Sequence, residues 1–147
     1  MRKSESGLVR AVRLEIRQDE VGALLGRGRQ RNSVSPYAGY CYVASEALYH
    51  LLWMMDVPGS TGYKPMYLRV NGDSHWFLSA PDGRVVDPTA DQFLSPPDYR
   101  QAKGKGFLTK HPSRRAQELI RRVCETTSSS VRFIDRRRRS GGQASQR

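Results

Sequence analysis

The most regular hydrophobic pattern in the chain begins at Cys41. Hydrophobic residues recur there at spacings of three and four, at Ala44, Ala47, Leu48, Leu51, Leu52 and Met55. This spacing predicts an amphipathic core helix that begins at Cys41 and is ended by Pro58 and Gly59. Cys41 lies three residues before Ala44 and is therefore expected in the first turn, on or near the buried face.

Three later segments have the pattern of strands. "KPMYLRV" alternates in hydrophobicity, and "SHWFLSA" and "RVVDPT" follow it along the chain. Asn71-Gly72, between the first two segments, is a strong hairpin dipeptide. The three segments together predict a small antiparallel sheet.

The turn "APDGR" decides on which face of that sheet Asp87 lies. A two-residue turn at Asp82-Gly83 places Asp87 and His75 on opposite faces. A three-residue loop, with Gly83 left-handed in a bulge, places Asp87 opposite Phe77 and on the same face as His75. The Pro-Asp-Gly sequence suits the three-residue loop, so we expect the imidazole and the carboxylate to meet.

The rest of the chain is less regular. "VRLEIR", residues 12–17, fits an edge strand, although "SGLVRAVRLEI" also fits a helix. Asp19 is a candidate cap of a short helix "EVGALLG", and residues 26–39 have the composition of a loop. Ser113 is expected to cap a second helix, whose apolar stripe is Ala116, Leu119, Ile120 and Val123.

These elements predict an α+β fold in which the helix that carries Cys41 packs on a small antiparallel sheet. A length of 147 residues and 37% hydrophobic content suit one domain, which we place at residues 1–130. Residues 131–147 contain at most a short strand, "VRFI", and their composition predicts a basic, disordered tail.

Charge and cysteine content narrow the classes of protein. The net charge is +11, and residues 110–147 hold eleven Lys or Arg against three acids, a net +8 that leaves +3 for the rest.

No apolar run suits a membrane span or a secretion signal, so we expect a cytoplasmic protein without a membrane partner. Two cysteines form no disulfide framework. The small size and basic end are compatible with a bacterial or phage protein.

Cys41, His75 and Asp87 supply the groups that thiol chemistry on a carbonyl needs. A thiolate attacks, a histidine takes and returns the proton, and a third group orients the imidazole. Amide groups at the start of a helix also stabilise a thiolate. A buried structural thiol, a sheet histidine and a turn aspartate are the alternative explanation of the same three residues. A zinc site is not expected, because no nearby Cys-x-x-Cys or His-x-x-x-His pair completes it.

In order and context, these residues resemble the transglutaminase-like branch of the papain-like superfamily. There a helix-opening Cys is followed by a strand beginning His-Trp or His-x-Trp, and then by a strand ending Asp-Pro-Thr. Here the segments are "GYCYVASEAL", "SHWFLSAPDG" and "RVVDPTADQF", within residues 37–93. The resemblance implies a minimal papain- or transglutaminase-like core without a cofactor. It also implies a cysteine peptidase, amidase, transglutaminase or acyltransferase, with Cys41 as nucleophile on a protein, peptide or amide substrate.

One departure from that family concerns the oxyanion donor. Papain-type enzymes carry Gln six residues before the nucleophile, and the position here is Ser35. The Cys41 amide is then expected to contribute the oxyanion site, and the further oxyanion or substrate candidates are Tyr40, Tyr42, Trp76 and Gln30.

The alternative function is a small basic nucleic-acid-binding or adaptor protein, or an inactive relative of the fold. Its candidate residues are the arginines of the second helix and of the tail: Arg114, Arg115, Arg121, Arg122, Arg136, Arg137, Arg138 and Arg139. Such binding weakens steeply with salt and does not need Cys41. The two functions can also be combined if the basic end brings an enzyme to a polyanion.

Overall fold

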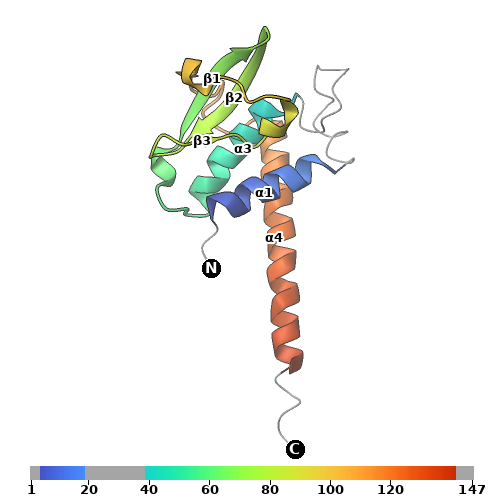
Figure 1. Ribbon diagram of the computed structural model, residues 1–147. Coiled ribbons are helices and arrows are strands. Elements are labelled where there is room, and N and C mark those ends of the chain that lie inside the picture. The colour runs from blue at the N-terminus through green and yellow to red at the C-terminus, as the bar shows by residue number, and fades with distance from the viewer. Residues whose placement is uncertain (1–3, 19–38, 142–147) are drawn as a thin grey trace, which may run out of the picture.

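The computed structural model describes residues 4–18 and 39–141, and side chains as far as residue 127. The described residues form the helices α1 (Glu5–Ile16), α3 (Cys41–Met54) and α4 (Arg114–Gly141) and one four-stranded sheet (Figure 1). The expected α+β class is therefore confirmed. The predicted Asp19 cap and its short helix, most of the 26–39 loop, and Gln30 lie outside the described residues.

The N-terminal segment is helical, so the edge-strand alternative for residues 12–17 is wrong. Ser4 caps α1 by accepting a hydrogen bond from the Gly7 amide at 3.1 Å. Leu8, Val12 and Ile16 recur every four residues and are buried on one side of the helix. The apparent alternation in "VRLEIR" arises because Leu14, between two buried residues, is exposed.

Helix α3 begins at Cys41, as the sequence predicts, but it ends before Pro58. Its last helical residue is Met54, and Asp56 adopts a left-handed conformation with φ of 51°. The Val57 amide then donates back to the Leu52 carbonyl at 3.1 Å, as in a Schellman motif. The helix is therefore ended by this backbone motif.

The sheet contains β1 (Lys64–Val70), β2 (Asp73–Ser79), β3 (Val85–Val86) and β4 (Lys103–Gly104), in the order β3-β2-β1-β4 with antiparallel pairing. The three predicted strands are present, and β4 adds a short edge strand. Asn71 and Gly72 both have positive φ, 52° and 84°, as a two-residue type I′ hairpin requires.

The second hairpin has the three-residue loop that the sequence favours. Gly83 is left-handed with φ of 87°, its amide donates to the Ala80 carbonyl at 2.8 Å, and the Ala80 amide donates to the Arg84 carbonyl at 2.9 Å. Leu78 pairs with Val86, which places Asp87 opposite Phe77. Asp87 therefore lies on the same face as His75.

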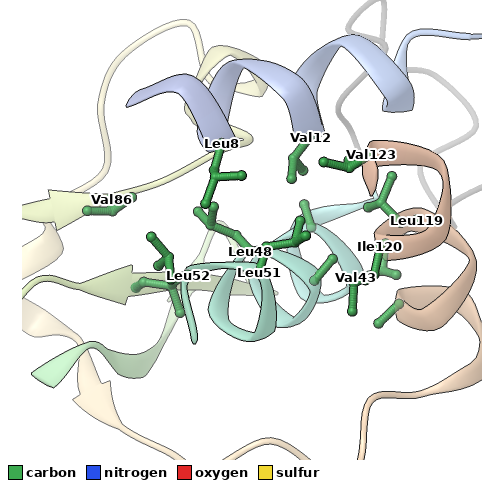
Figure 2. Close-up of a cluster of buried hydrophobic side chains, with 14 of the residues drawn as sticks. Leu8, Val12, Val43, Leu48, Leu51, Leu52, Val86, Leu119, Ile120 and Val123 are labelled. Atoms are coloured by element: carbon green, nitrogen blue, oxygen red, sulfur yellow. The ribbon is translucent and has the colours of Figure 1, made fainter. Parts of the chain in front are cut away.

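Helix α3 forms the centre of the core. It contacts the sheet on one side and α1 and α4 on the other, and the buried side chains of all these elements meet around Leu48 and Leu51 (Figure 2). Ser113 caps α4 as predicted, because its hydroxyl accepts a hydrogen bond from the Ala116 amide at 3.2 Å. The expected apolar stripe of α4 is buried, with Ala116, Leu119, Ile120 and Val123 all in the core.

Helix α4 continues to Gly141 and extends away from the rest of the protein (Figure 1). Residues 131–141, predicted to be a short strand and a disordered tail, are therefore helical. The sequence from 114 to 140 contains no glycine or proline, and arginine has a high helix propensity, so nothing local stops the helix. None of the helices in the described part of the chain is both long and apolar enough to cross a membrane.

Candidate active site

The three residues singled out from the sequence come together from three elements. Cys41 is the first residue of α3, His75 lies in β2, and Asp87 directly follows β3. His75 Nε2 and Asp87 Oδ2 are 2.6 Å apart, and each side chain is only 2% exposed. Because the register of the second hairpin sets which face Asp87 occupies, this contact depends on the three-residue loop.

Cys41 and the first turn of α3 are hydrogen-bonded to backbone carbonyls of β2. Its Sγ donates to the Ser74 carbonyl at 3.7 Å, and Ser45, one helical turn later, donates to the Trp76 carbonyl at 3.1 Å. Carbonyls two residues apart point to the same side of a strand, so α3 is fixed along that side of β2. This placement brings the thiol next to His75, on the neighbouring position of the strand.

His75 interacts with both other residues. Burial acts to lower the imidazole pKa, but hydrogen bonds to Asp87 and Cys41, together with their negative charges, outweigh it and raise the pKa to about 9. Nε2 contacts Asp87, and Nδ1 lies 3.4 Å from the side-chain nitrogen of Gln92. An imidazole that keeps its proton at neutral pH is the partner that a thiolate needs.

Asp87 is held by residues that the sequence analysis did not select. Its Oδ1 accepts from the Thr89 amide at 3.1 Å and from the Thr89 hydroxyl at 3.3 Å. The Tyr99 hydroxyl donates to Oδ2 at 2.7 Å, and burial and this bond raise the Tyr99 pKa. The contact of Thr89 could have been predicted, because Thr89 lies two residues after Asp87 in the Asp-Pro-Thr segment. Nothing in the sequence relates Tyr99 to Asp87.

Gln92 is a second residue that only the structure brings to the site. Its Nε2 lies 3.4 Å from His75 Nδ1 and 2.9 Å from the Thr89 hydroxyl. The ring of Phe93 meets His75 edge-on, with centroids 4.7 Å apart. Gln92 and Phe93, together with Ser74, Asp73 and His75, line a pocket of about 420 Å³.

The other oxyanion and substrate candidates lie in different environments. Tyr40 is the N-cap residue of α3 and is buried, and its side chain makes no capping hydrogen bond. The Tyr42 hydroxyl accepts from the Leu108 amide at 2.9 Å, and its ring packs edge-on against the buried Trp76. The first-turn amides of α3 are therefore better placed than Tyr42 or Trp76 to meet an oxyanion.

The arginines proposed to contact nucleic acid do not form one free cluster. Arg121 pairs with Glu118 and Glu125, both at 2.5 Å, and Arg122 pairs with Glu118 at 3.2 Å. Arg114 and Arg115 are exposed at the start of α4. The backbone of Arg136, Arg137, Arg138 and Arg139 belongs to α4, and their side chains lie outside the described part.

Comparisons with protein-family models, curated proteins and solved structures found no match to the chain. The side chains described by the structure also contain no group of three or more His, Cys, Asp and Glu placed to hold a metal ion. The fold and the geometry of Cys41, His75 and Asp87 are therefore the observations that bear on function.

Proposed function

We propose that the protein is a thiol-dependent amide hydrolase or acyltransferase that acts through an acyl-enzyme on Cys41. The observation that supports this most is the 2.6 Å contact between His75 and Asp87 on the strand whose neighbouring residue, Ser74, holds the Cys41 thiol at 3.7 Å. If His75 had only a structural role, the bond to Asp87 would satisfy it, and no thiol would be needed at the nearby start of α3. In this proposal Cys41 is the nucleophile, His75 the general base and acid, and Asp87 the orienting group.

The reaction uses only these groups and the substrate. His75 holds the thiol proton while Cys41 Sγ forms a bond to the carbonyl carbon, and the carbonyl oxygen becomes an oxyanion. Cleavage of the carbon–nitrogen bond passes the proton from His75 to the leaving amine and leaves a thioester. Water or another amine then attacks the thioester carbon and gives its proton to His75. The carbon–sulfur bond breaks, which releases the acid or the new amide and restores the Cys41 thiolate beside protonated His75.

The start of α3 supports the oxyanion part of the proposal. Amide groups in the first turn of a helix lack intrahelical partners and carry the positive end of the helix dipole. The N-cap residue Tyr40 makes no side-chain hydrogen bond to them. Such amides stabilise negative charge, in this proposal first on the thiolate and then on the oxyanion.

The proposal is tested by the rate at which iodoacetamide alkylates Cys41, in a Cys124→Ser background so that only one thiol reacts. Free thiols have a pKa of about 8.5 and are mostly protonated at pH 7, whereas a paired thiolate reacts quickly there. We expect fast labelling at pH 7 that His75→Ala slows at least about tenfold, because the imidazolium is lost.

His111→Ala is the matched control, since His111 is exposed and lies in a loop away from the site. Acyl transfer is then measured with p-nitrophenyl acetate. The expected product is an acetyl group on Cys41, detected by intact mass, and Cys41→Ala should not form it. Slow labelling that is the same with and without His75 contradicts the proposal and makes Cys41 a packing residue.

A further inference from the structure

A groove lies between α1 and β3, which is an edge strand of the sheet. Its volume is about 500 Å³, and residues along the length of α1 form one wall. Val85, Val86 and Asp87 form the other wall. The groove is separate from the pocket beside His75, because the two share no lining residue.

The charge in this groove is positive. Arg10, Arg13 and Arg17 recur at spacings of three and four, so they share one face of α1. Arg13 pairs with Asp91, and no ion pair among the described residues involves Arg10 or Arg17, which are exposed. The groove thus presents guanidinium groups to an incoming ligand.

The two acids that line the groove do not cancel this charge. Glu5 is held by Arg84 at 3.1 Å, and this contact lowers the Glu5 pKa. Asp87 is bonded to His75. Each carboxylate already has a cationic partner of its own, so Arg10 and Arg17 are left to meet carboxylates from outside.

The same groove exposes apolar side chains. Leu14 is 53% exposed and Val85 is 44% exposed, and both line the groove beside the half-buried Val9. Nucleic-acid backbones offer phosphates and sugars and have little to pack on such residues. Mixed apolar and cationic walls favour a segment of protein that carries both apolar and acidic side chains.

The backbone of β3 also offers hydrogen-bonding groups on its outer edge. Hydrogen bonding between Ala80 and Arg84 sets the alternation of the hairpin, so Leu78 and Val86 form the next hydrogen-bonded pair. Val85 lies between these positions and directs its N–H and C=O away from β2, toward the groove. An edge strand of this kind can pair with an added strand.

We propose that the groove between α1 and β3 binds an extended, acidic segment of a partner protein, which pairs with β3 while its carboxylates contact Arg10 and Arg17. The apolar side chains of the segment pack on Leu14 and Val85. This proposal does not depend on chemistry at Cys41.

The test uses fluorescence anisotropy with the full chain and a fluorescein-labelled peptide of alternating Glu and Val, about eight residues long, within the usual length of a strand. A peptide of alternating Gln and Val tests the need for carboxylates. Single-stranded oligothymidylate of similar charge distinguishes nucleic acid from protein. We expect only the Glu–Val peptide to bind tightly, and we expect salt to weaken this binding.

Two variants test the site. The double variant Arg10→Glu, Arg17→Glu should weaken binding at least about tenfold, because attraction becomes repulsion at two contacts. The control Arg114→Glu, Arg115→Glu makes the same change of charge at exposed residues of α4 and should leave binding within about twofold, since the charges lie away from the groove. Val85→Pro removes the free N–H and should also weaken binding.

Circular dichroism and thermal unfolding establish that each variant is folded. Should Val85→Pro not fold, Val85→Glu tests the same wall, and the two arginine variants still decide the proposal. Equal loss of binding in the α4 control means that only net charge matters and overturns the proposal. Binding of oligothymidylate that is as tight and as sensitive to Arg10 and Arg17 also overturns it, in favour of nucleic acid, and absence of peptide binding does so outright.

Discussion

At the scale of single residues, the site is organised around His75. One ring nitrogen is bonded to Asp87, the other lies 3.4 Å from Gln92, and the Cys41 thiol contacts the neighbouring residue, Ser74. Cys41, His75 and Asp87 could be selected from the sequence because a helix start and two strand patterns placed them. Gln92 and Tyr99 could not, because they belong to an irregular segment whose path is set by packing on Phe77 and His75.

The raised pKa of His75 predicts how stability depends on pH. Its pKa is about 9 in the folded protein and 6.5 without these contacts, so the stabilisation is fully present below pH 6.5 and is lost as the pH rises through about 9. The free energy of unfolding should fall by about 3–4 kcal/mol at most, since one pKa unit corresponds to about 1.4 kcal/mol. Urea unfolding between about pH 6 and about pH 10 measures this change.

The control for this experiment is His75→Gln, which keeps a polar side chain but does not titrate. Its unfolding free energy should change less over the same pH interval, and the difference between the two proteins isolates the imidazole. Identical pH profiles for both proteins contradict the assignment of a protonated, paired His75.

Tyr99→Phe tests whether the hydroxyl supports Asp87. It removes a 2.7 Å hydrogen bond to the carboxylate and should destabilise the fold by about 1–3 kcal/mol, as expected for a bond to a charged group. Alkylation of Cys41 at pH 7 should also change, because Asp87 holds His75. Tyr49→Phe is the control, since the Tyr49 ring packs on Phe107 and its hydroxyl has no hydrogen bond to the described residues. Equal effects of the two substitutions contradict a positioning role for Tyr99.

At the scale of elements, the second hairpin determines whether a site forms. The same strand residues joined by a two-residue turn would place Asp87 on the face opposite His75. Pro81, Asp82 and Gly83 form the three-residue loop, and this was recognisable from the sequence because turn chemistry is local. The end of α3 was less predictable, since a left-handed aspartate takes the place that glycine more often holds.

Gly83→Ala tests the backbone of this hairpin. A Cβ at Gly83 meets nothing within 4 Å, so its cost comes from the φ of 87° alone. We expect destabilisation of about 1–2 kcal/mol, the cost of a left-handed conformation for a residue with a side chain. Gly104→Ala is the matched control, because its Cβ also has open space and its φ lies outside the left-handed range. Chemical unfolding that shows no difference between the variants contradicts this explanation of the turn.

At the scale of the whole molecule, α3 connects the core to the site. Its middle packs between the sheet and the helices α1 and α4, while its first residue, Cys41, contacts β2 (Figures 1 and 2). Core packing therefore fixes the position of the thiol relative to His75. The contribution of α1 packing on α3 to the free energy of unfolding can be measured without an activity assay.

Leu8→Ala and Leu14→Ala form a matched pair for this purpose. Leu8 is fully buried against α3, whereas Leu14 on the same helix is 53% exposed. Leu8→Ala should destabilise the protein by about 2–5 kcal/mol through lost burial and a cavity. Leu14→Ala should change stability by only about 0.5 kcal/mol, as surface substitutions usually do. Similar unfolding midpoints for both variants contradict the packing of α1 described above.

Patterns along the chain were enough to predict the α+β class, the start of α3, both hairpin turns, and the cap and apolar stripe of α4, because each depends on contacts between neighbours in the chain. The pairing of His75 with Asp87 also followed, since turn length fixes strand register. Only the tertiary structure decided that residues 5–16 are helical, that Tyr99 and Gln92 reach the site, and that α1 and β3 enclose a groove. These features depend on which surfaces pack together, and local periodicity does not specify that choice.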